Sequence, residues 1–328
     1  MKAVTFTKYG SPAVLALRDV EKPTPQDNEV LIKVRAASVN AGDWHLMRGA
    51  PFLIRLGSGL VKPKIKILGA DIAGQVEAVG RNVTQFQAGN AVFGDISGYG
   101  FGAFAEYVAV PESALALKPA HSTFEQAAAV PAAALTALQG LRNHGQIQPG
   151  HKVLINGASG GVGSFAVQIA KALGAEVTGV CSTGKMEMVR SIGADHVIDY
   201  TREDFTQSGQ RYDLILAVGG NLSISAYKRA LTPTGVYVMI GGSSMSQFFQ
   251  TMILGPWMSM TSTRKMGLML VKANQPDLVF LSELLAAGKI IPVIDKQYPL
   301  AEVPGAIQYL EAGRAQGKVV ITVEEKNC

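Results

Sequence analysis

The second half of the chain alternates short apolar runs with helical patterns, and this alternation restricts the possible folds more than any other feature. Six of the runs have strand character, at residues 152–157, 175–181, 196–199, 212–218, 235–241 and 265–271. Most of the gaps between them carry helical patterns, at 162–173, 185–193 and 223–231. Strands joined by crossover helices predict an α/β fold with a parallel, doubly wound sheet.

The first of these strands ends in the sequence NGASGGVG, which runs from Asn156 to Gly163. A strand, a glycine turn and a helix form a dinucleotide-binding arrangement, because glycine lets the backbone approach a pyrophosphate and the free amides at the helix start favour its charge. The usual G-x-G-x-x-G pattern is a variant here, with Ala158 at its first position. An ordinary tight turn is the alternative. The predicted cofactor contacts are Ala158, Ser159, Gly160, Gly161, Val162 and Gly163.

The end of the second strand indicates which dinucleotide the turn would hold. NAD sites usually place Asp or Glu about 20 residues after the glycine turn, where it binds the ribose hydroxyls. This chain has Ser182, Thr183 and Lys185 in that region. Hydroxyls and an ammonium suit a 2′-phosphate, which a carboxylate would repel. A solvated loop with a capping hydroxyl is the alternative, and we predict NADPH.

The first third of the chain has a different sequence pattern. It contains short predicted strands and no long helical period, with strands at 29–37, 69–80 and 102–110. A helix is expected after residue 122, where Ser122 and Glu125 have the spacing of a capping box, and Pro131 should kink or split it. The closing segment, with helices near 276 and 301–312 and a strand at 317–323, is expected to rejoin the first third. The predicted domains are a discontinuous β-rich domain, 1–122 with 273–328, and a dinucleotide-binding domain, 123–272.

Composition narrows the classes of partner and compartment. The chain has 328 residues, a net charge of +5 and only two cysteines. Two cysteines provide no disulfide framework and fit a reducing compartment, so we expect a cytoplasmic protein. No apolar run approaches the roughly 20 residues that span a bilayer. Apart from the lysines between 62 and 66 the basic residues are dispersed, so neither a membrane nor a specific nucleic acid is an expected partner.

Four stretches of sequence resemble a known family. Residues 156–200, from NGASGGVG to HVIDY, resemble the cofactor domain of the medium-chain dehydrogenase/reductase superfamily. SVNAGDWHLMRGAP, ILGADIAGQVEAVG and GAFAEYVAVP resemble its quinone oxidoreductase and enone reductase branch. The resemblance implies a Rossmann domain, a GroES-like outer domain, and a homodimer that pairs the strand at 265–271 across a twofold axis.

The zinc-containing branch of the superfamily differs from this chain at the ligand positions. Zinc alcohol dehydrogenases have a Cys where Asn40 stands, a His where Ala70 stands, and another Cys near Pro131 or Ala132. A catalytic zinc needs about three protein ligands of N, S or O type. Because these positions offer neither Cys nor His, we predict no metal.

Chemistry without zinc favours an acceptor that is already electrophilic. Alcohol oxidation benefits from a metal that stabilises the alkoxide, whereas a quinone or an α,β-unsaturated carbonyl accepts a hydride once donors stabilise the resulting oxyanion. We therefore predict a small hydrophobic acceptor, namely a quinone, an enone or an alkenal. An enoyl-thioester reductase and a non-catalytic NADPH-binding sensor or structural protein are the alternatives.

The resemblance also suggests roles for individual residues. It implies that Asn40 lines the nicotinamide and substrate side of the site, and that His45, where relatives often carry Tyr or Lys, donates to the oxyanion or shuttles a proton. A capping Asn and a packing His are the alternatives. Asp43 is expected to shape the loop, since nothing in the sequence raises its pKa. The remaining predicted cofactor contacts are Thr136, Tyr200, Val218, Gly219, Ile240 and Gly241.

Overall fold

The computed structural model describes residues 1–220, 222–241, 245–260 and 263–323, and it divides into two compact units. Unit 1 comprises Met1–Ala133, Lys272–Gly288 and the chain from Ile294 onward, and unit 2 comprises Ala134–Val271 and Lys289–Val293. Within the described residues, no helix is both long enough and apolar enough to cross a bilayer. Each unit has its own sheet, and the two are described separately.

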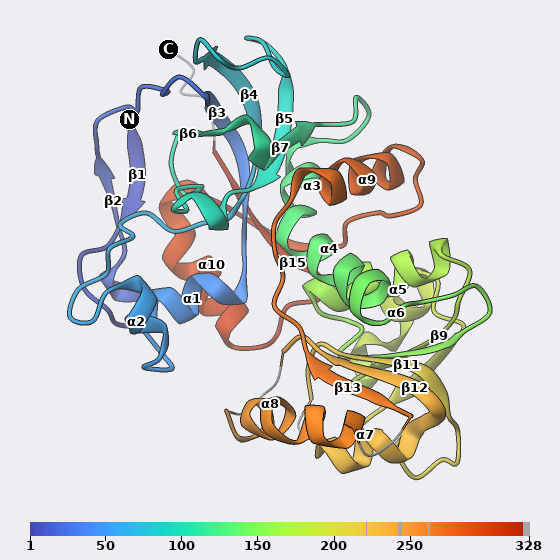
Figure 1. Ribbon diagram of the computed structural model, residues 1–328. Coiled ribbons are helices and arrows are strands. Elements are labelled where there is room, and N and C mark those ends of the chain that lie inside the picture. Colours follow the sequence, from blue (N-terminus) through green and yellow to red (C-terminus); the bar gives the residue numbers. More distant parts are fainter. Residues whose placement is uncertain (221, 242–244, 261–262, 324–328) are drawn as a thin grey trace. The chain divides into compact units, whose positions relative to one another are not determined.

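Unit 1 contains a seven-stranded sheet in the order β14-β15-β3-β4-β5-β7, with β6 also paired to β3 (Figure 1). Its strands are β3 (Glu29–Val39), β4 (Asp71–Val79), β5 (Ala91–Asp95), β6 (Tyr107–Pro111), β7 (Leu115–Leu117), β14 (Ile294–Pro299) and β15 (Lys318–Thr322). A separate pair is formed by β1 (Lys2–Thr5) and β2 (Ala16–Asp19). Val30, Ile32 and Val34 of β3 are buried. Because β15 pairs antiparallel with β3, the end of the chain returns to this sheet.

The helices of unit 1 differ from the sequence-based expectations in two places. Residues Ala41–Arg48 form α1, a helix where we expected a loop, and Ile54–Ser58 form the short α2. The capping box before α3 (Phe124–Ala128) uses Thr123 and Gln126, one residue later than the predicted pair Ser122 and Glu125. Ser122 lies before the N-cap residue Thr123, outside the helix, and its carbonyl accepts from the Lys118 ammonium.

The split expected at Pro131 is confirmed, since α3 ends at Ala128 and α4 runs from Pro131 to Leu138. The two compact units divide after Ala133, whereas the predicted boundary follows residue 122. The difference arises because α3 packs on β3 and β4 of unit 1. Two further helices of unit 1 are α9 (Gln275–Ala286), which packs on β7, and α10 (Val303–Glu311), which packs on β15.

Unit 2 contains a six-stranded parallel sheet in the order β10-β9-β8-β11-β12-β13. The strands are β8 (Lys152–Asn156), β9 (Glu176–Cys181), β10 (His196–Asp199), β11 (Tyr212–Ala217), β12 (Leu231–Met239) and β13 (Lys265–Leu268). The helices are α5 (Gly161–Ala172), α6 (Met186–Ser191), α7 (Ile224–Ala230) and α8 (Met245–Met260). The α5 and α6 helices pack on β8 to β10, and α7 and α8 pack on β12 and β13 (Figure 1).

The order of these strands determines where a ligand can bind. The chain moves outward from β8 through β9 to β10, then returns to the other side of β8 and continues through β11, β12 and β13. In open parallel sheets, ligands bind at the carboxyl ends of the strands where the order reverses. Here that point lies between β8 and β11, at the end of the strand that leads into the glycine turn.

Candidate functional site

The turn between β8 and α5 is close-packed backbone. Gly157 has a φ of +91°, which side-chain-bearing residues rarely adopt, and Gly160 precedes the first residue of α5. A Cβ atom on Gly163 would lie 2.1 Å from the Gly157 carbonyl oxygen, so the helix can sit this close only with glycine at that position. The first amides of α5 have no partner within the helix and are free to bind an anion. The turn therefore fits the pyrophosphate of a dinucleotide.

Two neighbouring strand ends lie beside this turn. The amides of Val218 and Gly219 donate to the Asn156 carbonyl, at 3.0 and 3.1 Å. The amides of Ile240 and Gly241 donate to the Ala217 carbonyl, at 2.9 and 3.3 Å. Three predicted groups of cofactor contacts therefore share the carboxyl edge of the sheet, at residues 158–163, 218–219 and 240–241.

The region after β9 contains a carboxylate, Asp199, in addition to the hydroxyls and the ammonium that the sequence analysis predicted. The Thr183 hydroxyl donates to Asp199, which also accepts from the amide and hydroxyl of Thr201 at 2.9 and 2.7 Å. These hydrogen bonds, that from Thr183 foremost, hold the pKa of Asp199 below its usual value. Asp199 is an anion that the sequence analysis overlooked, although its carboxylate is only 3% exposed and both its oxygens have donors. Tyr200 follows it and is largely exposed.

Thr136 is the remaining predicted cofactor residue of unit 2. It lies in α4 and is 8% exposed, with its side chain nearly enclosed. Its contact with a cofactor stays a prediction.

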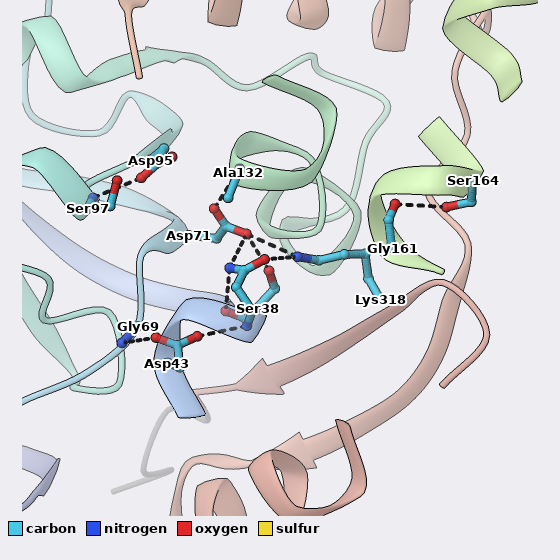
Figure 2. A network of polar contacts seen from close by, with 11 residues as sticks. Ser38, Asp43, Gly69, Asp71, Asp95, Ser97, Ala132, Gly161, Ser164 and Lys318 are labelled. Atoms are coloured by element: carbon cyan, nitrogen blue, oxygen red, sulfur yellow. Dashed lines mark hydrogen bonds and ion pairs between the residues drawn. The ribbon is translucent and has the colours of Figure 1, made fainter. Parts of the chain in front are cut away.

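A buried polar network in unit 1 contains Ser38, Asp71 and Lys318, which are labelled in Figure 2. Asn40, the residue immediately before α1, belongs to the same network. The Lys318 ammonium donates to Asn40 Oδ1 at 2.6 Å and to Asp71 Oδ2 at 3.2 Å. Asn40 Nδ2 donates to Asp71 Oδ2 at 2.9 Å, and the Ser38 hydroxyl donates to the same oxygen at 2.6 Å. The Ala132 amide donates to Asp71 Oδ1 at 2.8 Å. The Asn40 side chain is therefore held in one orientation by a lysine and an aspartate.

Lys318 and Asp71 were not identified from the sequence. The Lys318 and Asp71 side chains are 3% and 0% exposed, which makes this a fully buried ion pair. The strand GKVVITV was recognised, but a lysine near its start has the pattern of a solvent-facing residue. The one signal in the sequence was in the predicted strand at 69–80. There Asp71 interrupts the otherwise apolar run GADIAG, which indicates a buried carboxylate that needs a partner.

The structure corrects the expectation that nothing raises the pKa of Asp43. Complete burial raises the pKa of Asp43 to about 7, although hydrogen bonds from the Asn40 and Gly69 amides, at 2.7 and 3.0 Å, act in the opposite direction. Burial likewise raises the pKa of Asp95 to about 6, with a contribution from the charge of Asp71. Because Asp43 binds the amide before α1, its role is to fix the start of this helix.

His45 lies in the last turn of α1 and is half-buried. Its ring stacks on Trp44, with the centroids 3.6 Å apart, and its Nδ1 donates to the Ala50 carbonyl at 2.8 Å. A neutral imidazole has a proton on one nitrogen only. With Nδ1 donating, the Nε2 atom of neutral His45 is an acceptor, and it donates only when the ring is doubly protonated.

The positions that the zinc branch uses for its ligands lie close together in unit 1, but their chemistry does not suit the metal. Asn40 and Ala132 both bind Asp71, the residue that follows Ala70. Ala70 and Ala132 offer no side-chain donor atom, and the amide oxygen of Asn40 is taken by an ammonium. Among the residues that the structure describes, no group of three or more His, Cys, Asp and Glu side chains is arranged to hold a metal ion.

Comparison with known proteins is consistent with this architecture. Residues 26–120 match the family described as "Alcohol dehydrogenase GroES-like domain", and residues 192–321 match the family described as "Zinc-binding dehydrogenase". The 2-methylene-furan-3-one reductase of Solanum lycopersicum is 37% identical over 98% of this chain and 79% of its own length.

Two solved structures have the same fold over nearly the whole chain. The quinone oxidoreductase from Coxiella burnetii has a TM-score of 0.87 and 31% identity, and covers 99% of both chains. The Escherichia coli quinone oxidoreductase, described as complexed with NADPH, has a TM-score of 0.84 and 26% identity, with 98% of this chain and 100% of that one covered. The chain therefore belongs to the medium-chain dehydrogenase/reductase superfamily, where its relatives include quinone oxidoreductases and enone reductases, and it is an oxidoreductase that uses a nicotinamide coenzyme.

Proposed function

We propose that the protein is an NADPH-dependent, zinc-independent reductase that transfers a hydride to a quinone or to the activated C=C bond of an α,β-unsaturated carbonyl. One observation carries this proposal: the Lys318 ammonium is held against Asn40 and Asp71 at the positions where zinc relatives have their ligands. The ion pair holds the Asn40 side chain in one orientation, so that its amide can donate to an oxyanion that develops on a nearby acceptor. These positions provide no set of ligands for a zinc ion that could bind an alkoxide.

The coenzyme part of the proposal rests on the carboxyl edge of unit 2. Bound NADPH supplies the hydride. The amides from Gly161 to Gly163 would bind its pyrophosphate, since the Gly160 amide already donates to the Gly157 carbonyl at 3.2 Å. Ser182 and Lys185 would bind its 2′-phosphate. Thr183 has a smaller role than the sequence suggested, because its hydroxyl proton is donated to Asp199. Asp199 is compatible with a phosphate in this region because its oxygens accept from Thr183 and Thr201 and its charge is paired with Arg202, whose Nε lies 3.5 Å from Oδ2.

The acceptor part of the proposal assigns different tasks to Asn40 and His45. Asn40 Oδ1 is occupied by Lys318 and one Nδ2 proton by Asp71. The Nδ2 nitrogen also lies 3.5 Å from the Ser38 carbonyl oxygen, a long contact that its second proton can exchange for an acceptor's oxygen. His45 in its doubly protonated form would deliver the proton from Nε2.

The test is a panel of acceptors mixed with the purified protein and either NADPH or NADH, with turnover followed by the absorbance of the reduced nicotinamide. We expect oxidation of NADPH with quinones, enones or alkenals, a kcat/KM at least tenfold higher for NADPH than for NADH, and no effect of a metal chelator. Lys185→Gln should raise the KM for NADPH and leave that for NADH unchanged.

Two outcomes would contradict the proposal. Activity confined to saturated alcohols and abolished by the chelator would indicate the zinc chemistry of other superfamily members. Equal kcat/KM values for NADPH and NADH would refute the assigned role of Ser182 and Lys185. We also propose a homodimer through the β13 edge and a cytoplasmic location, neither of which the acceptor panel tests.

A further inference from the structure

A cavity of about 410 Å³ lies in unit 2, away from the carboxyl edge that receives the coenzyme. It is lined by Arg211, Ser225, Lys228, Arg229 and Arg264. Arg211 directly precedes β11, Lys228 and Arg229 are in the last turn of α7 before β12, and Arg264 directly precedes β13. Since parallel strands begin at the same edge of a sheet, the four cations gather at the amino-terminal edge.

This position separates the cavity from the dinucleotide site. The six residues of β11 extend over about 20 Å at the rise of an extended strand. Apart from Asn40 and Thr136, the predicted coenzyme contacts follow the carboxyl ends of β8 to β12, so a ligand in the cavity would not be the bound dinucleotide.

The cations of the cavity have few partners. Arg211 Nη1 donates to the Gly209 and Gln210 carbonyls at 3.1 and 3.0 Å, and Arg264 Nη2 donates to the Leu231 carbonyl at 3.3 Å. Arg264 Nε is buried without an acceptor. In the part of the chain that the structure describes, Lys228 and Arg229 make no side-chain hydrogen bond or ion pair, and no acidic residue lines the cavity.

Helix electrostatics explain only part of this arrangement. Cations in the last turn of a helix stabilise its free carbonyls, which accounts for Lys228 and Arg229 on α7. Arg211 and Arg264 come from outside that helix, and the unpaired Nε of Arg264 still requires an acceptor. Three guanidinium groups and an ammonium around one cavity match a ligand with several anionic oxygens, since guanidinium groups bind phosphate in paired hydrogen bonds.

We propose that this cavity is a second anion site, which binds the phosphate groups of a small polyanion of the diphosphate class. The backbone contacts of Arg211 and Arg264 fix two guanidinium groups at its wall, and Lys228 and Arg229 supply two further charges whose side chains have no partner among the described residues. A single carboxylate would neutralise only one of the four cations. A diphosphate neutralises most of them and offers several acceptor oxygens to the guanidinium groups at the wall.

The test is a calorimetric titration of inorganic diphosphate into the full-length protein at low salt, with NADPH present in excess to occupy the carboxyl edge. We expect saturable binding to one site, weakened at least about tenfold in Arg229→Gln and in Lys228→Gln, because each loses a charge-assisted contact. Arg18→Gln is the matched control, since it removes the same charge from an exposed position on β2 of unit 1. It should bind diphosphate as the unaltered protein does.

Parallel titrations identify the ligand class. Tighter binding of ADP than of diphosphate would indicate a nucleotide, and equal binding would indicate that the phosphates alone are recognised; both support the proposal. Citrate binding as tightly as diphosphate, no saturable binding at millimolar diphosphate, or equal weakening in Arg18→Gln and Arg229→Gln would overturn it. Because binding is measured without turnover, failure of the proposed reductase activity would not change these outcomes.

Discussion

Lys318 is the residue on which both the stability and the chemistry of the Asn40 network depend. Its ammonium is the cationic partner of Asp71, which has no exposed surface. In Lys318→Met the Asp71 carboxylate would keep its hydrogen bonds from Ser38, Asn40 and Ala132 but lose its counter-charge. Removing one partner of a buried ion pair costs about 3–5 kcal/mol. We expect that decrease in the free energy of unfolding, measured by denaturant titration.

The double variant Lys318→Met with Asp71→Asn separates folding from chemistry. Neutralising both partners removes the unpaired charge, so most of the lost stability should return. Turnover should still fall, by up to about 10²-fold in kcat, because the Asn40 amide that donates to the oxyanion loses the ammonium and the carboxylate that orient it. A double variant that is stable and fully active would show that the ion pair serves the fold alone.

Asp43 makes stability depend on pH in a direction unusual for a carboxylate. Its pKa is about 7 in the folded chain and 3.8 ordinarily, so the folded state holds the proton more tightly. The contribution is therefore fully present below pH 3.8 and is lost as the pH rises towards 7, with a slope of at most about 1.4 kcal/mol per pH unit. Asp95, with its pKa raised to about 6, acts in the same direction.

The measurement is the free energy of unfolding as a function of pH in the unaltered protein and in Asp43→Asn. The variant has lower stability throughout, because its amide nitrogen faces a backbone donor, but its pH profile should be flatter. Asp27→Asn, at an exposed position that pairs with Arg81, is the control and should keep the original slope. An unchanged slope in Asp43→Asn would contradict the assignment.

The element that tests the dinucleotide proposal most directly is the glycine turn. In Gly163→Ala the new Cβ would lie 2.1 Å from the Gly157 carbonyl oxygen, so α5 must shift away from β8. We expect a loss of stability of about 1–3 kcal/mol and weaker binding of NADPH, measured by unfolding and by fluorescence titration. Gly160→Ala is the matched control for the loss of stability, because its Cβ would meet nothing closer than 3.6 Å and its φ is −84°. Equal losses of stability in the two variants would refute the steric explanation.

Strands and helices of unit 2 were largely predictable because hydrophobic periodicity there reflects burial directly. The β8 to β11 strands begin and end within one residue of the predicted runs, whereas β12 begins earlier, at Leu231. The α1 helix was missed because its sequence, AGDWHLMR, buries only Asp43 and Met47 and lacks an apolar stripe. Its start is specified by the hydrogen bond from the Asn40 amide to the Asp43 carboxylate. In the sequence, an Asn followed three residues later by an Asp is also typical of an ordinary loop.

At the scale of the whole molecule, the site in unit 1 could not be read from local sequence. Lys318 binds Asn40 across 278 residues of chain, and the contact exists because β15 pairs with β3. The return of the final strand was expected from its position after unit 2, but its register was not. Register decides whether Lys318 faces solvent or Asp71, since a slip of one residue reverses every side chain on a strand.

The exposed edge of the unit 2 sheet is where the proposed homodimer can be tested. Among the described strands, β13 pairs with β12 alone, and the residues that follow it, Leu270 and Val271, are 79% and 41% exposed. Pairing with a second copy would cover an edge that otherwise presents free backbone groups and apolar side chains. Leu270→Lys should therefore shift the protein from dimer to monomer in sedimentation velocity.

Ile291→Lys is the control: this residue of unit 2 is 60% exposed but lies outside the strand edge, so a lysine there should leave the dimer intact. A monomeric unaltered protein would refute the dimer. A Leu270→Lys variant that remains dimeric would show that the interface does not lie at the β13 edge.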